Sequence, residues 1–549
     1  MRFNCFLYNN ISVPAGSRCC PGHVNDDAFT DQAIHMMSNC RPNTDFNRTE
    51  IVDMFNKVRE TLLNNKERGI SFDSKLGDAD FKNLTGLDKV PFDDIFTYLT
   101  SVRDTQVRSA RTCLGIFLTK LKTGISNKVL STLFSVSKDS IRCAISSVRK
   151  NLIQTFTPHN LGFQHLTREQ VINDHTRPLA QTLFGKGLEP AILVIDGTYI
   201  YIQKSSQFCF QRRSFNLHKH RPLIKPIVIV TTTGYFVSVM GPYLSDFKNN
   251  DAIILKHIFA TDTEEIKKWT REGDVFVVDR GFRDSVDFLN ELGITTEMPA
   301  FLDKGQKQLT TEQSNTSRLV TKIRWVVESA NGRLKSWKYF DKVLPNSQIP
   351  FIGDYIQIIC SICNKYFSPL SHGNQEEDRV IGCKMLFLAK QSNDLKTSIE
   401  HEGIEKITSA EWTRIDAINI SFPSLSEEEI RCLAIGVYQV NLAKSYVQEH
   451  LKELAEFTVY VCKQDEHLIC AKLQSRHVSS KAYLLWILYD ECNVISWYCK
   501  CRTGSRVVGM CAHVASVIWY LAYARNLNQP FCCQRLDRIF KRCQKHARA

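Results

Sequence analysis

The clearest patterning of hydrophobic and polar positions lies between residues 188 and 340, and it predicts a layered α/β domain. Apolar runs at 191–196 and 274–279 predict buried strands, and residues 199–203 predict either a continuation of the first strand or a second one. Residues 227–243 predict a hairpin that turns at Gly234. The remaining elements are helical patterns at 249–259, 283–293 and 317–337, a short candidate strand at 295–300 and a polar insert at 303–317.

These elements follow one another in the order β-β-β-α-β-α-β-α, which is that of ribonuclease H-like nucleases and transferases. The run at 274–279 is apolar at nearly every inner position, which is typical of a strand covered on both faces. We therefore predict an α/β protein in which residues 188–365 form a ribonuclease H-like domain built on a mixed sheet.

Residues 96–155 carry a different pattern, with three apolar-periodic segments separated by short breaks. Ser126 and Ser137 stand where side chains cap helices, and the tight link between the last two segments resembles that of a helix-turn-helix. The third segment has a basic polar face, which suits a recognition helix in a DNA major groove. Its candidate DNA contacts are Lys138, Arg142 and Arg149. The alternative is a three-helix packing unit without a role in DNA binding.

The flanking segments differ from these two in composition. We expect an N-terminal arm at 1–45, a linker with one or two helices at 46–95, a linker at 366–425, a small α+β unit at 426–525 and a basic tail at 526–549. The arm holds Cys5, Cys19, Cys20, His23 and Cys40. Zinc could join four of these side chains, but their spacing lacks a paired knuckle, so an irregular cysteine-rich arm is the alternative.

Composition narrows the choice of partner and of cysteine chemistry. The 549-residue chain has a formal net charge of +13, which favours a polyanionic partner such as nucleic acid. We expect no membrane span and no signal peptide, and therefore an intracellular protein. Its 20 cysteines are then reduced thiols, to be interpreted as metal ligands before disulfides.

The cysteines near the C-terminus have a specific spacing. Cys499 and Cys501 are followed after nine residues by Cys511 and His513. Two side chains from a strand and two from a helix start would give a tetrahedral zinc site of three thiolates and one imidazole. Such a closed site is structural, which implies binding to DNA or protein rather than catalysis. The pattern resembles the CxC…CxH ligands of a SWIM zinc finger, and Cys492 is the nearest competing thiol.

Three acidic residues occupy positions suited to catalysis. Asp196 and Asp279 end two apolar strands, and Glu328 lies in the helical segment at 317–337. If the strands are neighbours, the carboxylates converge, and they need a cation to neutralise them. Oxygen ligands without His or Cys suit Mg²⁺ or Mn²⁺, and the chemistry such ions serve is phosphoryl transfer. The alternatives are strand-end caps for the aspartates and an ordinary Arg324–Glu328 ion pair.

The sequences IDGTY, VVDRGF and RWVVESANGRLK resemble the three catalytic motifs of the acidic-triad (DDE) transposases, most closely those of the PIF/Harbinger group. The resemblance covers roughly residues 96–365. It is most specific in the third motif, through Arg324, Glu328, Gly332 and Lys335. By helical spacing, positions 324, 328, 331 and 335 share one face. Arg324 and Lys335 would then flank Glu328 and contact phosphates or orient the carboxylates.

A further candidate DNA surface lies between the first two motifs, where basic residues alternate with aromatic ones. The basic residues are Arg212, Arg213, Lys219, Arg221 and Lys225, and the aromatic ones are Phe208, Phe210 and Phe215. Such a mixture suits contacts with the DNA backbone and stacking on bases. A charged hairpin rim is the alternative.

The resemblance implies a nuclear DNA transposase, or an endonuclease derived from one, that cleaves transposon ends and transfers the strand to target DNA. We expect double-stranded DNA as partner, a homo-oligomer, and a protein partner for the zinc finger. The alternative is a catalytically inactive, domesticated protein that binds DNA or chromatin. A nuclease without strand transfer would share the same site.

Overall fold

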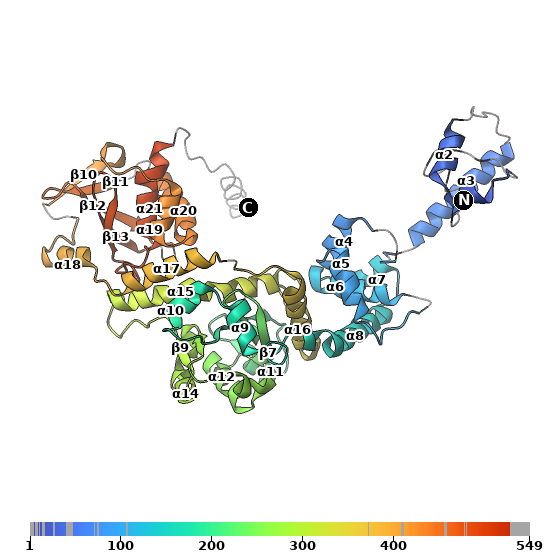
Figure 1. The fold of residues 1–549 in the computed structure, drawn as a ribbon, viewed down its shortest axis with the longest axis horizontal. Helices are drawn as coiled ribbons and strands as arrows, with labels where there is room; N and C mark the ends of the chain where they lie inside the picture. The colour runs from blue at the N-terminus through green and yellow to red at the C-terminus, as the bar shows by residue number, and fades with distance from the viewer. Residues whose placement is uncertain are drawn as a thin grey trace. The chain divides into compact units, whose positions relative to one another are not determined.

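A computed structural model describes most of the chain, which divides into two units at residues 1–148 and 149–549 (Figure 1). The described residues are 5, 9, 11, 13, 17–25, 28–39, 48–67, 69–70, 72–73, 76–105, 108–371, 373–407, 411–454, 458–476, 478 and 480–527. The basic tail expected at 526–549 lies almost entirely outside them. Among the helices described, none is both long enough and apolar enough to cross a membrane.

The first unit is helical apart from one small antiparallel pair, β1 (Val24–Asn25) and β2 (Ala28–Phe29). Its helices are α2 (Asp31–Ser38), α3 (Arg48–Glu67), α4 (Asp78–Thr85), α5 (Lys89–Thr97), α6 (Ala110–Thr123), α7 (Asn127–Phe134) and the start of α8 (Lys138–Thr155). In the N-terminal arm Cys19 and Cys20 are exposed, whereas Cys40 lies outside the described residues. A zinc site in this arm therefore stays a prediction.

The three helices expected in residues 96–155 form, with the caps that the sequence indicated. The Ser126 hydroxyl accepts the amide of Val129, and the Ser137 hydroxyl accepts the amide of Ser140. Helices α4 and α5 also contribute to this unit, because α4 packs against α6. Its core contains Phe72, Phe81, Phe92 and Phe134, whose ring centroids lie 5.0–6.2 Å apart in contacting pairs.

The basic face predicted for α8 is smaller in the structure than in the sequence. Lys138 and Arg142 are exposed, and Arg142 pairs with Asp139 one turn earlier. Arg149 is buried, pairs with Asp354, and lies 4.4 Å from the ring centroid of Phe351. The expectation that Arg149 contacts DNA is therefore contradicted, because its guanidinium already has a carboxylate partner inside the protein.

The second unit is built around a seven-stranded mixed sheet, as expected. Its strands are β3 (Ile192–Gly197), β4 (Ile200–Tyr201), β5 (Phe215–Asn216), β6 (Arg221–Thr231), β7 (Phe236–Leu244), β8 (Val275–Val277) and β9 (Thr295–Glu297). Strand β6 is antiparallel to β7 and β3, whereas β3, β8 and β9 run parallel. The β6–β7 hairpin turns at Gly234, whose φ of 86° favours glycine.

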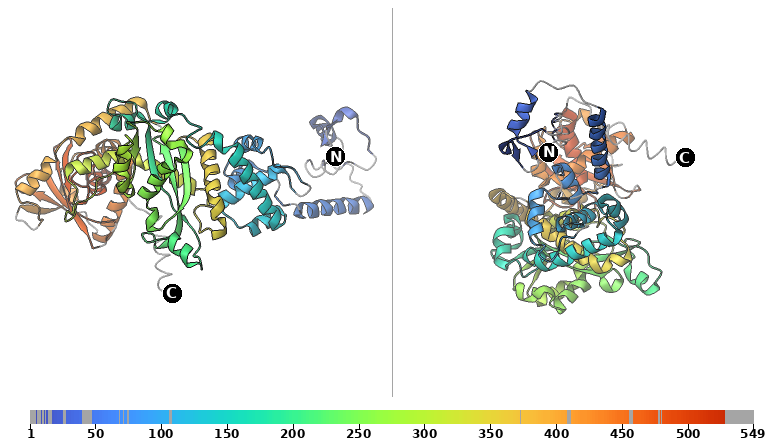
Figure 2. Two further views of the ribbon diagram at one scale, coloured as in Figure 1. Left: turned by 90° about the horizontal axis from the view of Figure 1, so that it is seen from below. Right: turned by 90° about the vertical axis from the view of Figure 1, so that its right-hand side faces the viewer.

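Helices cover both faces of this sheet, which explains why its central strands are hydrophobic throughout. One face packs on α12 (Asp251–Ala260) through residues such as Leu193, Ile229 and Leu255. Helix α15 (Thr311–Lys335) packs on β3, β6 and β8, and α16 (Ile349–Tyr366) lies alongside β7 (Figure 2). The other helices around the sheet are α9 (Arg168–His175), α10 (Pro178–Phe184), α11 (Phe208–Ser214), α13 (Ile266–Trp269) and α14 (Val286–Glu291).

Helix α15 is longer than the sequence suggested, because it takes up the second half of the expected polar insert. Thr310 caps the helix by accepting the amide of Gln313, while the Gln313 side chain accepts the amide of Thr310. This reciprocal pair is a capping box, a signal that the polar composition of the insert concealed. The helix that carries Glu328 is therefore 25 residues long.

The C-terminal part folds around a second, antiparallel sheet of five strands. They are β10 (Trp412–Asp416), β11 (Thr458–Cys462), β12 (Leu468–Gln474), β13 (Ala482–Tyr489) and β14 (Val494–Cys499), in sequential order. The main core joins one side of this sheet to α19 (Glu427–Ala434), α20 (Val437–Leu454) and α21 (Ala512–Ile518). A smaller core joins Trp412, Trp486 and Tyr498 to Leu395 and Ile399.

Residues 366–425 are not the simple linker that their polar composition suggested. They contain α17 (Gln375–Ala389), α18 (Asp394–His401) and β10, the edge strand of the C-terminal sheet. Helix α17 packs against α10 and α15, beside which it is drawn in Figure 1. This segment therefore packs against helices of the seven-stranded sheet and contributes a strand to the five-stranded one. These contacts are long-range, and local composition does not reveal them.

The buried carboxylate of Asp274 connects helix α9 to the chain segments that precede β3 and β8. It accepts hydrogen bonds from Arg168 of α9 and from the main-chain amides of Ala191 and Arg271. We expect Asp274→Ala to lower the free energy of unfolding by about 3–5 kcal/mol, because it leaves the half-buried Arg168 guanidinium and two main-chain amides without their acceptor. Chemical denaturation measures this. Asp287→Ala, on the exposed side of α14, is the control, and an equal loss in both variants would contradict the prediction.

Candidate active site and metal centre

Asp196 and Asp279 occupy equivalent positions at the ends of two neighbouring strands. The last paired residues of the parallel strands β3 and β8 are Val194 and Val277, and each aspartate follows two positions later. Asp196 accepts the amide of Gly197, and Asp279 accepts the amide of Gly281 at 2.7 Å. The strand register therefore brings two carboxylates to the same edge of the sheet, as the sequence predicted.

A third aspartate, which the sequence analysis did not select, lies beside these two. Asp251 begins α12, and an added Cβ at Gly281 would lie 2.8 Å from Asp251 Oδ2 and 2.9 Å from Asp279 Oδ1. Asp251 also pairs with Lys225 at 2.9 Å, and Lys225 is buried. The expectation that Lys225 contacts DNA is therefore contradicted. A signal was present in the sequence, because Asp251 stands near the start of the helix predicted at 249–259.

The electrostatics of the site reflect this concentration of carboxylates. Burial raises the pKa of Asp196 to about 7, and Asp279 and Asp251 add to the increase while Arg324 opposes it. Burial also raises the pKa of Asp279, against the hydrogen bond from Gly281. The pKa of the neighbouring Tyr199 rises to about 12 through burial and the same three carboxylates. The site therefore favours a bound cation.

Glu328 lies on α15, but it does not converge with the two aspartates. Its side chain is 58% exposed and pairs with Arg324 on the preceding turn. Among the described residues, the carboxylates of Asp196, Asp279 and Glu328 do not form a group whose oxygens all lie within 4.8 Å of one another. Arg324 instead lies close enough to both aspartates to lower their pKa values, so it connects Glu328 to them electrostatically.

Two other residues of α15, Asn331 and Lys335, lie close to Asp196. The Asn331 amide donates to Asp196 Oδ2 at 3.3 Å, and its own Oδ1 is buried without a partner among the described residues. Burial lowers the pKa of Lys335, and the nearby Asp196 partly opposes this. Asn331 and Lys335 share a helical face with Arg324 and Glu328, as the spacing predicted.

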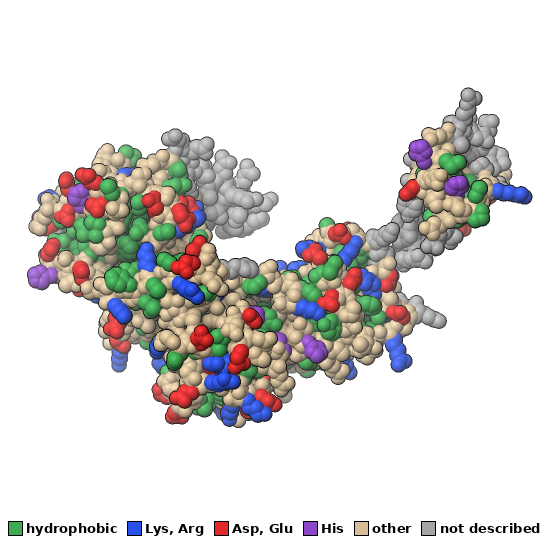
Figure 3. Space-filling model, viewed as in Figure 1, with side chains coloured by type: hydrophobic (Ala, Val, Ile, Leu, Met, Phe, Trp, Pro, Cys, Tyr) green, Lys and Arg blue, Asp and Glu red, His purple; other side chains and the backbone are tan. Residues whose placement is uncertain are grey.

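The basic and aromatic stretch between the motifs forms an unpredicted helix, α11. Arg212, Arg213 and Phe208 are exposed, and Phe208 is 90% exposed. Arg213 lies 3.4 Å from Asp246. On the face shown in Figure 3, the basic side chains of the described residues are mixed with acidic ones rather than gathered in one patch. The exposed residues of α11 therefore remain the candidate DNA contacts in this stretch.

The four residues of the C-terminal pattern meet in one buried cluster. Their ligand atoms all lie within 4.8 Å of one another, and His513 Nδ1 is 3.9 Å from the sulfurs of both Cys499 and Cys511. Tetrahedral zinc with bonds of about 2.3 Å to sulfur places its sulfur ligands about 3.8 Å apart. The donor set and its dimensions therefore fit a four-coordinate zinc ion.

Three of the four ligands come from the elements that the sequence indicated, whereas Cys501 lies beyond the strand that was expected to carry it. Cys499 ends β14, Cys501 follows it in a turn, and Cys511 is the N-cap of α21, so the helix begins one residue before His513. Hydrogen bonds from Cys499 and Cys501 hold the pKa of the Cys511 thiol well below its usual value. Cys492 is exposed and lies outside the cluster.

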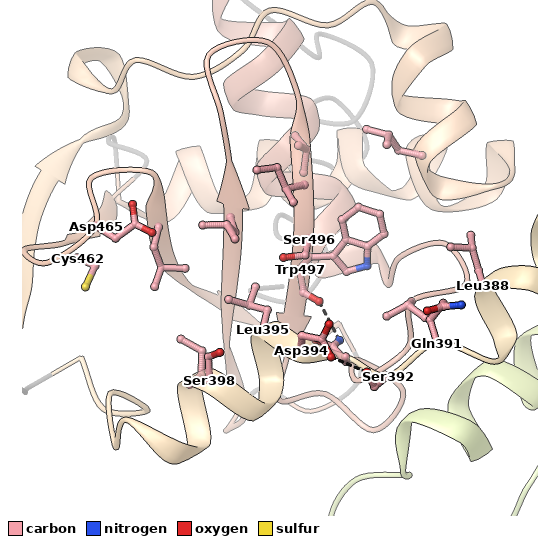
Figure 4. A pocket seen from close by; sticks show the side chains of 18 of the residues that line it. Leu388, Gln391, Ser392, Asp394, Leu395, Ser398, Cys462, Asp465, Ser496 and Trp497 are labelled. Atoms are coloured by element: carbon pink, nitrogen blue, oxygen red, sulfur yellow. Dashed lines mark hydrogen bonds between the residues drawn. The ribbon is translucent and has the colours of Figure 1, made fainter.

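A hollow of about 800 Å³ lies between α18 and strand β14 (Figure 4). Leu395, Asp394 and Trp497 are among the side chains that line it. Asn393, also in its wall, donates to the carbonyl oxygens of Trp497 and Ser505. The segment between α17 and α18 is thereby fixed to the chain that leads into the metal centre.

Comparison with known proteins supports the catalytic part of this description. Residues 195–364 match the family model described as DDE superfamily endonuclease, a range that includes Asp196, Asp279 and Glu328. No curated protein matches the chain. The solved structure "Mos1 transposase paired-end complex with left transposon end" is 11% identical, over 57% of this chain and 94% of that chain, with a TM-score of 0.14, which is too low to support an argument. Residues 195–364 are therefore similar to the DDE superfamily endonucleases.

Proposed function

We propose that this protein is a DDE transposase of PIF/Harbinger type, or an endonuclease derived from one. Its reaction would be metal-dependent cleavage of DNA strands at transposon ends, followed by transfer of the freed 3′-hydroxyl to target DNA. The observation that carries the proposal is the register of β3 and β8, which places Asp196 and Asp279 side by side within the endonuclease domain.

The residues of the site fit a divalent cation such as Mg²⁺ or Mn²⁺. Partly buried carboxylates with raised pKa values gain most from a cation, and Asp196 and Asp279 are in that situation. When bound, such ions activate the attacking water or hydroxyl and stabilise the leaving oxygen. The chain itself orients the carboxylates, through Asn331 on Asp196 and Gly281 on Asp279.

The remaining parts of the proposal concern recognition of double-stranded DNA. Lys138 and Arg142 of α8 are exposed on a helix whose position in a helix-turn-helix would suit a major groove. Arg212 and Arg213 would contact the backbone near the catalytic carboxylates, and Arg324 and Lys335 would contact the phosphate at the site. We further propose a homo-oligomer that acts in the nucleus.

The Cys₃His cluster would hold zinc as a SWIM finger and present a surface to DNA or to a protein partner. The alternative function is that of a domesticated protein that binds DNA without cutting it. The exposed position of Glu328, in an ion pair with Arg324, is the observation that favours this alternative. An assay of DNA cleavage separates the two.

We expect Asp279→Asn and Glu328→Gln each to reduce strand cleavage by about three orders of magnitude or more. In the proposed reaction both residues are charged metal ligands, Glu328 once its exposed ion pair with Arg324 has opened. The substrate is duplex DNA carrying the inverted repeats that flank the gene, assayed with Mg²⁺ or Mn²⁺. The control is Glu312→Gln, an exposed position near the start of the same helix. Cleavage that survives Asp279→Asn would refute the assignment. Binding without any cleavage by the unmodified protein would support the domesticated alternative.

The raised pKa of Asp196 makes stability depend on pH when Mg²⁺ and Mn²⁺ are absent. The folded protein retains this proton up to about pH 7, whereas the unfolded chain releases it near pH 4, so stability falls as the pH rises through this interval. We expect Asp196→Asn to be more stable than the unmodified protein at pH 8, by up to about 4 kcal/mol, and about equally stable at pH 4.

Thermal melts of zinc-loaded protein across this pH range measure the difference. Asp303→Asn, which removes an exposed carboxylate, is the matched control and should show no such pH dependence. If the Asp196→Asn variant is less stable at pH 8, burial does not destabilise the charged form of this carboxyl group.

Neutralising Lys138 and Arg142 should weaken binding to DNA and reduce its salt dependence. For every phosphate that the protein no longer neutralises, the slope of log K against log salt falls by about 0.9. Fluorescence anisotropy at several salt concentrations measures both effects. The control neutralises two exposed lysines of α13, Lys267 and Lys268. An unchanged slope in the α8 variant would identify this helix as a packing element only.

A further inference from the structure

The chain segment that enters α15 is hydrogen-bonded to the loop that carries the zinc ligands. We call residues 499–511 the ligand loop. The Gln308 side-chain amide donates to the carbonyl oxygens of both Cys499 and Cys501, at 2.7 Å each, and Tyr498 donates its hydroxyl to Gln308 Oε1 at 3.1 Å. A single side chain before α15 therefore contacts the main chain of two proposed ligands.

The first turns of α15 continue this contact along the loop. Asn315 is fully buried, and its Oδ1 accepts the amides of Val507 and Val508 at 2.9 and 3.2 Å. Ser505 donates to the carbonyl of Leu309, whose own amide donates to the carbonyl of Arg502. Several main-chain groups of the ligand loop thus form their hydrogen bonds with α15 and the residues just before it, rather than with the C-terminal sheet. Because buried main-chain groups need such partners, the order of the ligand loop and that of the start of α15 depend on each other.

Buried positive charge adds to this dependence. Arg506 of the ligand loop is buried against the three thiols, and Arg318 of α15 is buried close to Arg506. Zinc with three thiolates and one neutral imidazole carries one negative charge. That charge would help to balance the two guanidinium groups, because a buried cation without a partner is costly.

Helix α15 runs without interruption from this contact to the catalytic carboxylates. Asn315 and Glu328 are 13 residues apart, which corresponds to about 20 Å along the helix axis. The helix packs on β3, β6 and β8, and its second half carries Arg324, Glu328 and Asn331. A stiff helix held at its first turns has its rotation about the axis fixed, and that rotation decides where Glu328 points.

We propose that the ligand loop, ordered by zinc, is the support that sets the position of the Glu328 helix, with Gln308 and Asn315 as positioning residues. The zinc centre would then be part of the catalytic domain's architecture as well as a binding module. The expected effect on DNA cleavage rests on the proposed function, whereas the expected effect of zinc on the order of α15 does not.

The test is hydrogen exchange of the full-length protein, with zinc content measured in parallel. The variants are Cys511→Ser, which removes a ligand, and Gln308→Met, which keeps the side chain's size but removes both donated hydrogen bonds. We expect each to speed exchange in the amides of 312–330 by about tenfold, while α12 exchanges at its original rate. Gln308→Met should retain one zinc per chain and should lower kcat for cleavage more than it raises KM.

Three results are decisive. Unchanged exchange in 312–330 for both variants would overturn the proposal, as would an equal increase in α12, which would indicate general unfolding. Faster exchange confined to 312–330 supports it. Because exchange is measured without substrate, a protein that never cleaves DNA can still pass or fail this test, so failure of the proposed function is recognised separately.

Discussion

The structure depends on one continuous helix that is packed against two different parts of the fold. Helix α15 lies on the central strands of the catalytic sheet, and its first turns receive the ligand loop through Asn315 and Ser314. Its second half carries Glu328 as well as Arg324 and Asn331, which act on the aspartates. One part of a helix cannot rotate about the helix axis relative to another part without breaking main-chain hydrogen bonds. The contacts at the first turns of α15 therefore also restrict the orientation of its second half.

The edge of the sheet that carries Asp196 and Asp279 concentrates negative charge where access of water is restricted. Burial, more than repulsion between neighbours, raises the pKa of Asp196, and Lys225 offsets Asp251 by pairing with it. Arg324 pairs with Glu328 and also lowers the pKa values of Asp196 and Asp279, so one guanidinium interacts with all three carboxylates. The ion pair with Glu328 is exposed and worth only a fraction of 1 kcal/mol, about 0.3–0.5. Breaking this ion pair would therefore cost little free energy if Glu328 moved towards Asp196 and Asp279.

The sequence predicted those features that are written in local patterns. The strands that end at Asp196 and Asp279, the hairpin at Gly234, the caps at Ser126 and Ser137 and the Cys₃His cluster all formed as expected. The features it missed depend on contacts between distant residues. Arg149 and Lys225 are basic residues in basic surroundings, and only the fold places Asp354 and Asp251 beside them. The same applies to residues 366–425, whose polar composition hides an edge strand and two packed helices.

The separation of residues 188–365 and 426–525 into independent modules was the expectation most affected by tertiary structure. Each has its own hydrophobic core, as the sequence indicated, yet polar side chains of one satisfy the main chain of the other. Hydrogen bonds to buried main-chain groups are costly to lose, because the groups left behind have no access to water. Polar residues such as Gln308 and Asn315 stand in a stretch that looks like a solvent-exposed insert, so periodicity alone could not have revealed their role. An insert that is polar because it binds another part of the chain, rather than solvent, can be recognised only once the fold has placed that part beside it.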